Sequence, residues 1–171
     1  SIFAINTAGS GTAVTVTGNT IGGATPHAIV SGTSGLTTAS GILTGIATAG
    51  GTTLTVTGNT INNITNYSNN TSSSLGGIIH SGTTATTATI SNNTISNVLL
   101  AAGTLTNLDG GGSTTLTANT NSIFNASVTG ASGTIYGMRA GTTQFTFNNN
   151  IIHDLAFTAN SGTTSSTIYG I

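Results

Sequence analysis

The 171-residue chain has one basic and two acidic residues and a formal net charge of −1, which excludes the clustered lysine and arginine that bind nucleic acids or anionic membranes. The absence of cysteine excludes a disulfide framework and thiolate metal sites. No apolar run approaches the ~20 residues of a membrane-spanning helix, and regularly spaced Ile, Val and Leu argue against a disordered chain. We therefore expect an ordered protein with no nucleic-acid partner and no membrane insertion.

One stretch of sequence, TTLTVTGNTINNI, recurs in related form along the chain, and a shorter motif such as LTGI or IYGM lies between its copies. Self-similarity at a period of about 30 residues is the signature of a solenoid, in which each repeat forms one coil. We predict a single solenoid segment over residues 1–171 and expect it to be a window of a longer repetitive chain. The copies of the long repeat occupy residues 12–24, 52–64, 86–98, 114–126 and 143–155.

Each long repeat opens with apolar and polar residues in alternation, as in Leu54-Thr-Val56-Thr, which predicts a strand with one buried face. The same alternation places Phe145 and Phe147 in the core. Gly18, Gly58 and Asn92 then supply a bend. A second strand follows around Ile61 and its copies, and the short motif forms a third strand. Parallel connections are nearly always right-handed. The predicted fold is all-β, a right-handed parallel β-helix of about five coils with three short strands per coil.

Two coils are longer than the others, and both receive their additional residues after the second strand. These segments lie near residues 25–42, which include the sole proline, and near residues 65–74. We expect both to protrude as loops from the same side of the solenoid, where solenoids often carry recognition. The chain begins on SIFAI and finishes on TIYGI, two copies of one strand, so we expect uncapped ends that stack on further coils or on other copies.

An asparagine follows the bend in every copy of the long repeat. Stacked coils place equivalent residues about 4.8 Å apart, so each amide can donate to one neighbouring copy and accept from another. We interpret these asparagines as a buried structural ladder and not as a functional site. The ladder consists of Asn19, Asn59, Asn93, Asn121 and Asn150.

Threonine dominates the positions that we expect to face outward. Because threonine suits a solvent-facing strand, these residues need no further function. Regular Thr-x-Thr files also resemble the ice-binding face of β-solenoid antifreeze proteins, which makes binding through this face an alternative. One predicted outward file is Thr12, Thr52, Thr86, Thr114 and Thr143, and the other is Thr15, Thr55, Thr89, Thr117 and Thr146.

The few titratable residues form one predicted contact. Asp109 and Arg139 follow the short motif in successive coils, which predicts an inter-coil ion pair worth ~0–1 kcal/mol if exposed. The three histidines, His27, His80 and His153, fall in different columns of the repeat. We therefore expect each histidine on the solvated surface, and no shared metal site.

The motifs GNTINNI at 58–64 and TIYGI at 167–171 resemble those of the very large, repetitive β-helix surface proteins that gliding and predatory Bacteroidota secrete through the type IX pathway. The resemblance extends over the whole chain. It implies an extracellular or cell-surface location and a role as an adhesin or as part of an appendage. The repeats of that family are scaffolding, so the resemblance implies no functional residue.

Three classes of function stay open. We favour a structural and adhesive segment of an extracellular filament or cell-surface appendage, whose partner is another copy or further coils of the same solenoid. The alternative is a module that binds glycans or ice through the threonine face or the loops. A polysaccharide-active enzyme is the least favoured, because such chemistry needs paired carboxylates whereas Asp109 and Asp154 fall at different corners. We expect no catalysis and no cofactor.

Overall fold

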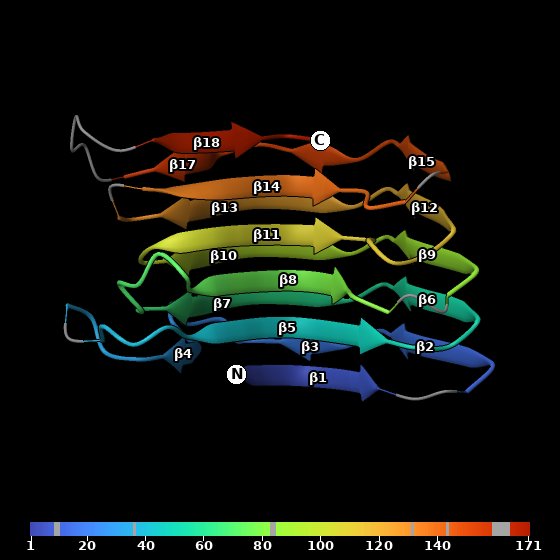
Figure 1. Ribbon diagram of the computed structural model, residues 1–171, viewed down its shortest axis with the longest axis horizontal. Helices are drawn as coiled ribbons and strands as arrows, with labels where there is room; N and C mark the ends of the chain where they lie inside the picture. Colours follow the sequence, from blue (N-terminus) through green and yellow to red (C-terminus); the bar gives the residue numbers. More distant parts are fainter. Residues whose placement is uncertain (9–10, 36, 83–84, 131, 143, 159–164) are drawn as a thin grey trace.

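The computed structural model describes the chain apart from residues 9–10, 36, 83–84, 131, 143 and 159–164 (Figure 1). In the described residues every regular element is a β-strand, and the strands stack as a parallel β-solenoid. No helix in this part of the chain is long and apolar enough to cross a membrane. The predicted fold class is therefore confirmed.

Three parallel sheets, which we call A, B and C, form the three sides of the solenoid. Sheet A contains β1 (Ile2–Ala8), β5 (Ile42–Ala49), β8 (Ser74–His80), β11 (Gly103–Asp109), β14 (Gly133–Arg139) and β18 (Ser166–Tyr169). Sheet B contains β2 (Ala13–Thr17), β6 (Thr53–Thr57), β9 (Thr87–Ser91), β12 (Thr115–Asn119) and β15 (Gln144–Asn148). Sheet C contains β3 (Thr20–Ile21), β4 (Ile29–Ser31), β7 (Thr60–Asn66), β10 (Thr94–Leu100), β13 (Ser122–Val128), β16 (Ile151–Ile152) and β17 (Leu155–Phe157).

Equivalent residues of successive coils pair directly with one another. Val56 of β6, for example, pairs with Val16 of β2 on one side and with Ile90 of β9 on the other. In Figure 1 the strands of sheet A run from left to right in front, and the chain returns behind them in sheet C while it rises from coil to coil. This winding is right-handed, as the connection rule for parallel strands predicts.

Inward-facing residues of the three sheets fill the interior with columns of Ile, Leu and Val. Leu43, Leu75 and Leu105 form one such column in sheet A, and each is at most 1% exposed. A fully buried side chain of this size contributes about 1.5–3 kcal/mol. The core therefore consists of apolar columns that run along the axis, and each coil adds one layer to them.

The prediction that Phe145 and Phe147 belong to the core needs a correction. Both occupy inward columns, because Phe145 pairs with Leu116 and Phe147 with Ala118. Phe145 is nevertheless 58% exposed, and Phe147 is half-buried. The reason is their place in the stack: β15 is the last strand of sheet B, so no described strand covers it on the far side.

The bend between sheets B and C uses the left-handed backbone conformation in every coil. The bend that we predicted at Gly18, Gly58 and Asn92 is confirmed by φ values of 67°, 66° and 57°. The same position has φ values of 57° at Thr120 and 52° at Asn149. Glycine and asparagine tolerate this conformation, whereas a β-branched threonine is strained in it.

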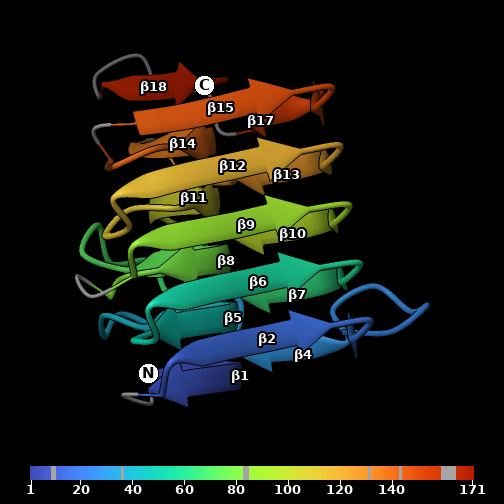
Figure 2. The same ribbon diagram turned by 90° about the vertical axis from the view of Figure 1, so that its right-hand side faces the viewer.

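The first long segment is not a single loop, as predicted for residues 25–42. It contains β4, which rejoins sheet C and pairs Ile29 with Ile64 of β7. The residues that leave the sheet are 22–28, and we call this segment the excursion; it interrupts a strand between Ile21 and Ile29. Figure 2 shows the excursion projecting beside β4 at the lower right.

The second long segment is buried in part. Asn66 belongs to β7, and Ser68 and Ser73 are at most 2% exposed, whereas residues 71–72 are exposed. The segment packs against the residues that follow β4: the Asn69 N–H donates to the Thr37 carbonyl at 2.9 Å. A backbone hydrogen bond thus joins the two long segments at one corner of the solenoid, where the sequence suggested two free loops.

Candidate functional site

The five ladder asparagines lie one above another, each directly before a strand of sheet C. The side-chain oxygen of Asn121 accepts the backbone N–H of Asn93 at 3.1 Å and its side-chain amide at 3.0 Å. The Asn121 amide donates to the Ile90 carbonyl of the preceding coil and to Asn150 Oδ1. The same bonds link Asn19 to Asn59 and Asn59 to Asn93.

The three inner asparagines of the ladder use their side-chain hydrogen-bonding groups within the protein. Asn59, Asn93 and Asn121 are each 1% exposed, and both polar atoms of each side chain are hydrogen-bonded within the protein. A buried amide in this state stabilises the fold, because leaving any of these groups unpaired costs about 1–3 kcal/mol. These three residues therefore hold successive coils in register and leave no polar atom free for a ligand. The end members Asn19 and Asn150 are half-buried, so the predicted burial holds for the inner three.

The outward face of sheet B is flat, uncharged and rich in threonine. The predicted file of Thr15, Thr55, Thr89, Thr117 and Thr146 lies on it, and its members pair in register. Sequence reasoning missed a second file on the same face, two residues earlier in each strand. It contains Thr53, Thr87 and Thr115, with Ala13 and Gln144 in the end strands.

The other predicted threonine file does not lie on the face of the sheet. Thr12, Thr52, Thr86 and Thr114 are exposed, but they precede the strands of sheet B. Thr52 is two residues before the inward Leu54, so a strand continued to Thr52 would point it inward. Its hydroxyl instead donates to the Thr12 carbonyl of the preceding coil at 2.7 Å. The last member of this file, Thr143, lies outside the described residues.

Asp109 and Arg139 pair in adjacent strands of sheet A and form an ion pair. Arg139 Nε donates to Asp109 Oδ2 at 3.0 Å, and the hydrogen bond to Asp109 raises the pKa of the guanidinium. The Asp109 side chain is 8% exposed, and its Oδ1 accepts the Gly111 N–H at 2.8 Å. Both carboxylate oxygens thus accept hydrogen bonds within the protein.

The three histidines lie in three different surroundings, and one of them contradicts the prediction of a solvated surface. His80 is 1% exposed, and its Nδ1 lies 3.0 Å from Thr48 Oγ1 and 3.2 Å from the Thr48 carbonyl oxygen. His153 is exposed, with Nδ1 2.7 Å from Asp154 Oδ2. His27 is also exposed and belongs to the excursion. The described residues contain no cluster of three or more metal-ligating side chains.

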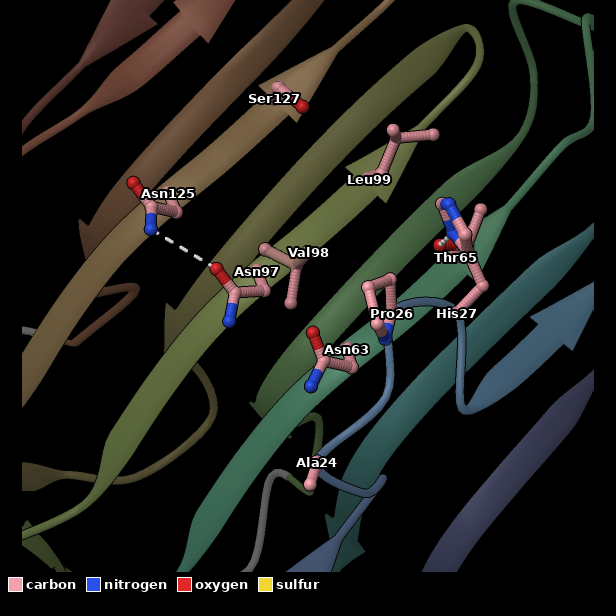
Figure 3. A pocket seen from close by; sticks show the side chains of 10 residues that line it. All are labelled: Ala24, Pro26, His27, Asn63, Thr65, Asn97, Val98, Leu99, Asn125 and Ser127. Atoms are coloured by element: carbon pink, nitrogen blue, oxygen red, sulfur yellow. Dashed lines mark hydrogen bonds between the residues drawn. The ribbon is translucent and has the colours of Figure 1, made fainter.

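The outer face of sheet C carries a groove of about 390 Å³, which the excursion closes at one end (Figure 3). One row of lining residues, Asn63, Asn97 and Asn125, comes from the left-handed corners of β7, β10 and β13, with φ of 52–53°. A second row, two residues further along the same strands, consists of Thr65, Leu99 and Ser127.

Two contacts fix the excursion over the closed end of the groove. The Asn63 amide donates to the Gly23 carbonyl at 2.5 Å, and His27 Nδ1 lies 2.6 Å from Thr65 Oγ1. The His27 ring also lies 5.7 Å from the Tyr67 ring, centroid to centroid. Sequence reasoning identified the insertion, but it gave no indication that this segment contacts the corner at Asn63. No family model, curated protein or solved structure matches this chain.

Proposed function

We propose that this chain is a non-catalytic structural and adhesive segment of an extracellular filament or cell-surface appendage, in which the stacked coils form a stiff rod. The observation that supports this role best is the ladder. Each coil is tied to the next by the same buried asparagine bonds and by three parallel sheets. A scaffold of this kind transmits load along its axis through hydrogen bonds that all point in that direction.

The two end faces of the stack support a partner of the same kind. Ile2 in β1 is 46% exposed, and Phe145 in β15 is 58% exposed. Ile2 pairs with the buried Leu43 and Phe145 with the buried Leu116, so both continue inward columns that a further coil in the same register would cover. The partner is further coils of the same solenoid or a second copy in head-to-tail contact, which gives an open filament. The uncharged surface also fits adhesion to neutral glycans.

The arrangement of the acids supports a role without catalysis. Asp109 belongs to sheet A and is held by Arg139, whereas Asp154 lies at a corner of sheet C beside His153. Glycoside hydrolysis needs two carboxyl groups that face one bond across about 5–9.5 Å. Two acids on different sides of the solenoid cannot act on one glycosidic bond.

Two measurements test the rod and its location. Negative-stain electron microscopy of the chain and of a tandem fusion of two copies should show rods whose length grows with the number of coils, and Phe145→Asp should reduce end-to-end association. Antibodies against the chain should label intact cells of the source organism without lysis. Compact particles from the fusion, or labelling only after lysis, would contradict the proposal.

Binding to ice through the threonine face is a second candidate. It is favoured by the two in-register threonine files on the uncharged face of sheet B. Thermal hysteresis of the purified chain, compared with that of Thr55→Lys and Thr89→Lys, tests it directly. A wild-type chain that does not depress the freezing point below the melting point would eliminate this candidate.

A further inference from the structure

We propose that the groove on sheet C binds a segment of a neutral polysaccharide that lies parallel to the solenoid axis. The coils rise by about 4.8 Å per step, which is comparable to the length of one sugar unit in an extended chain. The coils of β10 and β13 would therefore each offer one exposed Asn and one residue of the second row to a sugar, whereas Asn63 and Thr65 are buried under the excursion. This binding activity is separate from the scaffold role, because the rod can form without it.

The first argument is the set of unused hydrogen-bonding groups. The Asn125 amide donates to Asn97 Oδ1 at 3.1 Å, which fixes both side chains. Within the described part of the chain, Asn97 Nδ2 and Asn125 Oδ1 have no hydrogen-bond partner, and both residues are exposed. The groove thus presents a donor and an acceptor in adjacent coils. A sugar hydroxyl, which can donate and accept, satisfies either group.

The second argument is the shape of the groove. The two rows form its walls, Leu99 of the second row supplies aliphatic carbons, and the rings of Pro26 and His27 stand at its closed end (Figure 3). Ring faces and aliphatic carbons fit the C–H faces of a sugar, while the amides meet its hydroxyls. A purely apolar ligand would displace water from these amides and leave them without hydrogen-bond partners, which would make its binding unfavourable.

The chemistry of the groove disfavours peptides and acidic ligands. β7, β10 and β13 are each paired on both sides, so they offer no free edge to which a peptide strand could add. None of the described residues that line the groove is charged. In the next coil the column of Asn63, Asn97 and Asn125 continues with Asp154, whose side chain is 65% exposed and would repel a polyuronate.

Titration calorimetry on the purified chain tests the site. The probes are hexasaccharides of β-glucose, mannose, galactose and N-acetylglucosamine, with hexagalacturonate as the acidic comparison. We expect at least one neutral probe to bind with a low-millimolar or smaller Kd and to shift the side-chain amide NMR signals of Asn97 and Asn125. Hexagalacturonate should bind more weakly.

Matched variants connect binding to the groove. Asn97→Gly keeps a residue that accepts the positive φ and should weaken binding about tenfold. The control Asn92→Gly changes an exposed asparagine of φ 57° at another bend and should leave the Kd unchanged. Ser127→Arg should block the groove, whereas Ser122→Arg, in the same strand but outside it, should not.

Thermal unfolding of each variant shows whether it is folded, and electron microscopy shows whether the rod persists. Absence of binding by every neutral probe would overturn the proposal, and so would tighter binding of hexagalacturonate. Equal affinity of wild type, Asn97→Gly and Ser127→Arg would place the ligand elsewhere and would also overturn it. None of these results changes the length of the rod, so they are distinguishable from a failure of the scaffold role.

Discussion

The side-chain oxygen of Asn93 accepts two hydrogen bonds from Asn59, one from the backbone N–H and one from the side-chain amide, each 3.0 Å long. The Asn93 amide donates in turn to the Val56 carbonyl and to Asn121 Oδ1, both at 3.0 Å. One buried side chain thus joins three successive coils. Its loss would remove a partner from the Asn59 N–H and the Val56 carbonyl on one side and from Asn121 Oδ1 on the other.

The first prediction concerns this residue. Asn93→Leu keeps a similar volume but removes all four bonds, so we expect a loss of about 3 kcal/mol or more in the free energy of unfolding. The control is Asn69→Leu, because Asn69 is exposed and only its backbone N–H is bonded, so its change should stay within about 0.5 kcal/mol. Urea denaturation measures both. Equal losses at the two positions would contradict a buried ladder.

The second prediction concerns Thr120, a β-branched residue with a φ of 57°. The equivalent residues are Asn92 in the preceding coil and Asn149 in the next, and asparagine tolerates this conformation. We expect Thr120→Asn to stabilise the protein by about 1 kcal/mol through relief of backbone strain. Thr89→Asn, inside β9, is the control and should not stabilise. A lower thermal midpoint for Thr120→Asn would refute this explanation.

The third prediction concerns the pH dependence of stability. Burial lowers the pKa of His80 below its ordinary value of 6.5, although the hydrogen bond to the Thr48 carbonyl and the Asp109 carboxylate act in the opposite direction. The unfolded chain therefore takes up a proton before the folded chain does. The contribution of His80 to stability is complete above pH 6.5 and is lost as the pH falls below that value.

Thermal midpoints measured from about pH 7.5 to about pH 5 test this dependence. We expect the midpoint of the wild type to fall across this range and that of His80→Gln to fall less, whatever its starting value. His153→Gln, which changes an exposed histidine, should behave as the wild type does. A fall of the same size in His80→Gln would exclude His80 as the cause.

The fourth prediction concerns the ion pair on sheet A. Arg139→Met leaves the nearly buried Asp109 carboxylate without its partner, whereas Asp109→Asn keeps an oxygen for the Gly111 N–H. Arg139 is 48% exposed, so solvent screening limits the cost of Arg139→Met to about 1 kcal/mol. Asp109→Asn should cost less. Denaturation at pH 7 in low salt compares them, and a larger cost for Asp109→Asn would contradict this view of the pair.

Much of the fold could be predicted because each strand repeats one alternation in every coil. The pattern around Leu54 and Val56 sets the inward face, and Asn59 marks the next bend. The same alternation, applied further, would have corrected the placement of His80. Ile78 points inward, so His80 does too. This error came from the residue type, because a polar ring was assigned to the surface without regard to its place in the alternation. The file of Thr52 is exposed as predicted, although it precedes the strands of sheet B.

Other features depend on contacts that no periodic pattern contains. The return of the chain at Ile29 requires Ile64 as a partner, and the packing of residues 67–73 requires carbonyl groups of the preceding coil. The groove requires both the excursion and the asparagine corners of three coils. Each feature joins residues that are distant in sequence and occur only once, so the repeat carries no signal for it.

The place where the excursion leaves sheet C has a consequence for engineering. The chain leaves the sheet after Ile21 and returns at Ile29. In the next coil only Asn62 and Asn63 lie between the partners of these two residues. The next coil nevertheless pairs with the first coil both before and after the excursion. A foreign peptide could therefore be inserted at this corner of any coil without disrupting the strand pairing of sheet C. Guests placed in chosen coils would be held at multiples of one coil's rise, so the molecule could serve as a ruler for arranging epitopes or enzymes.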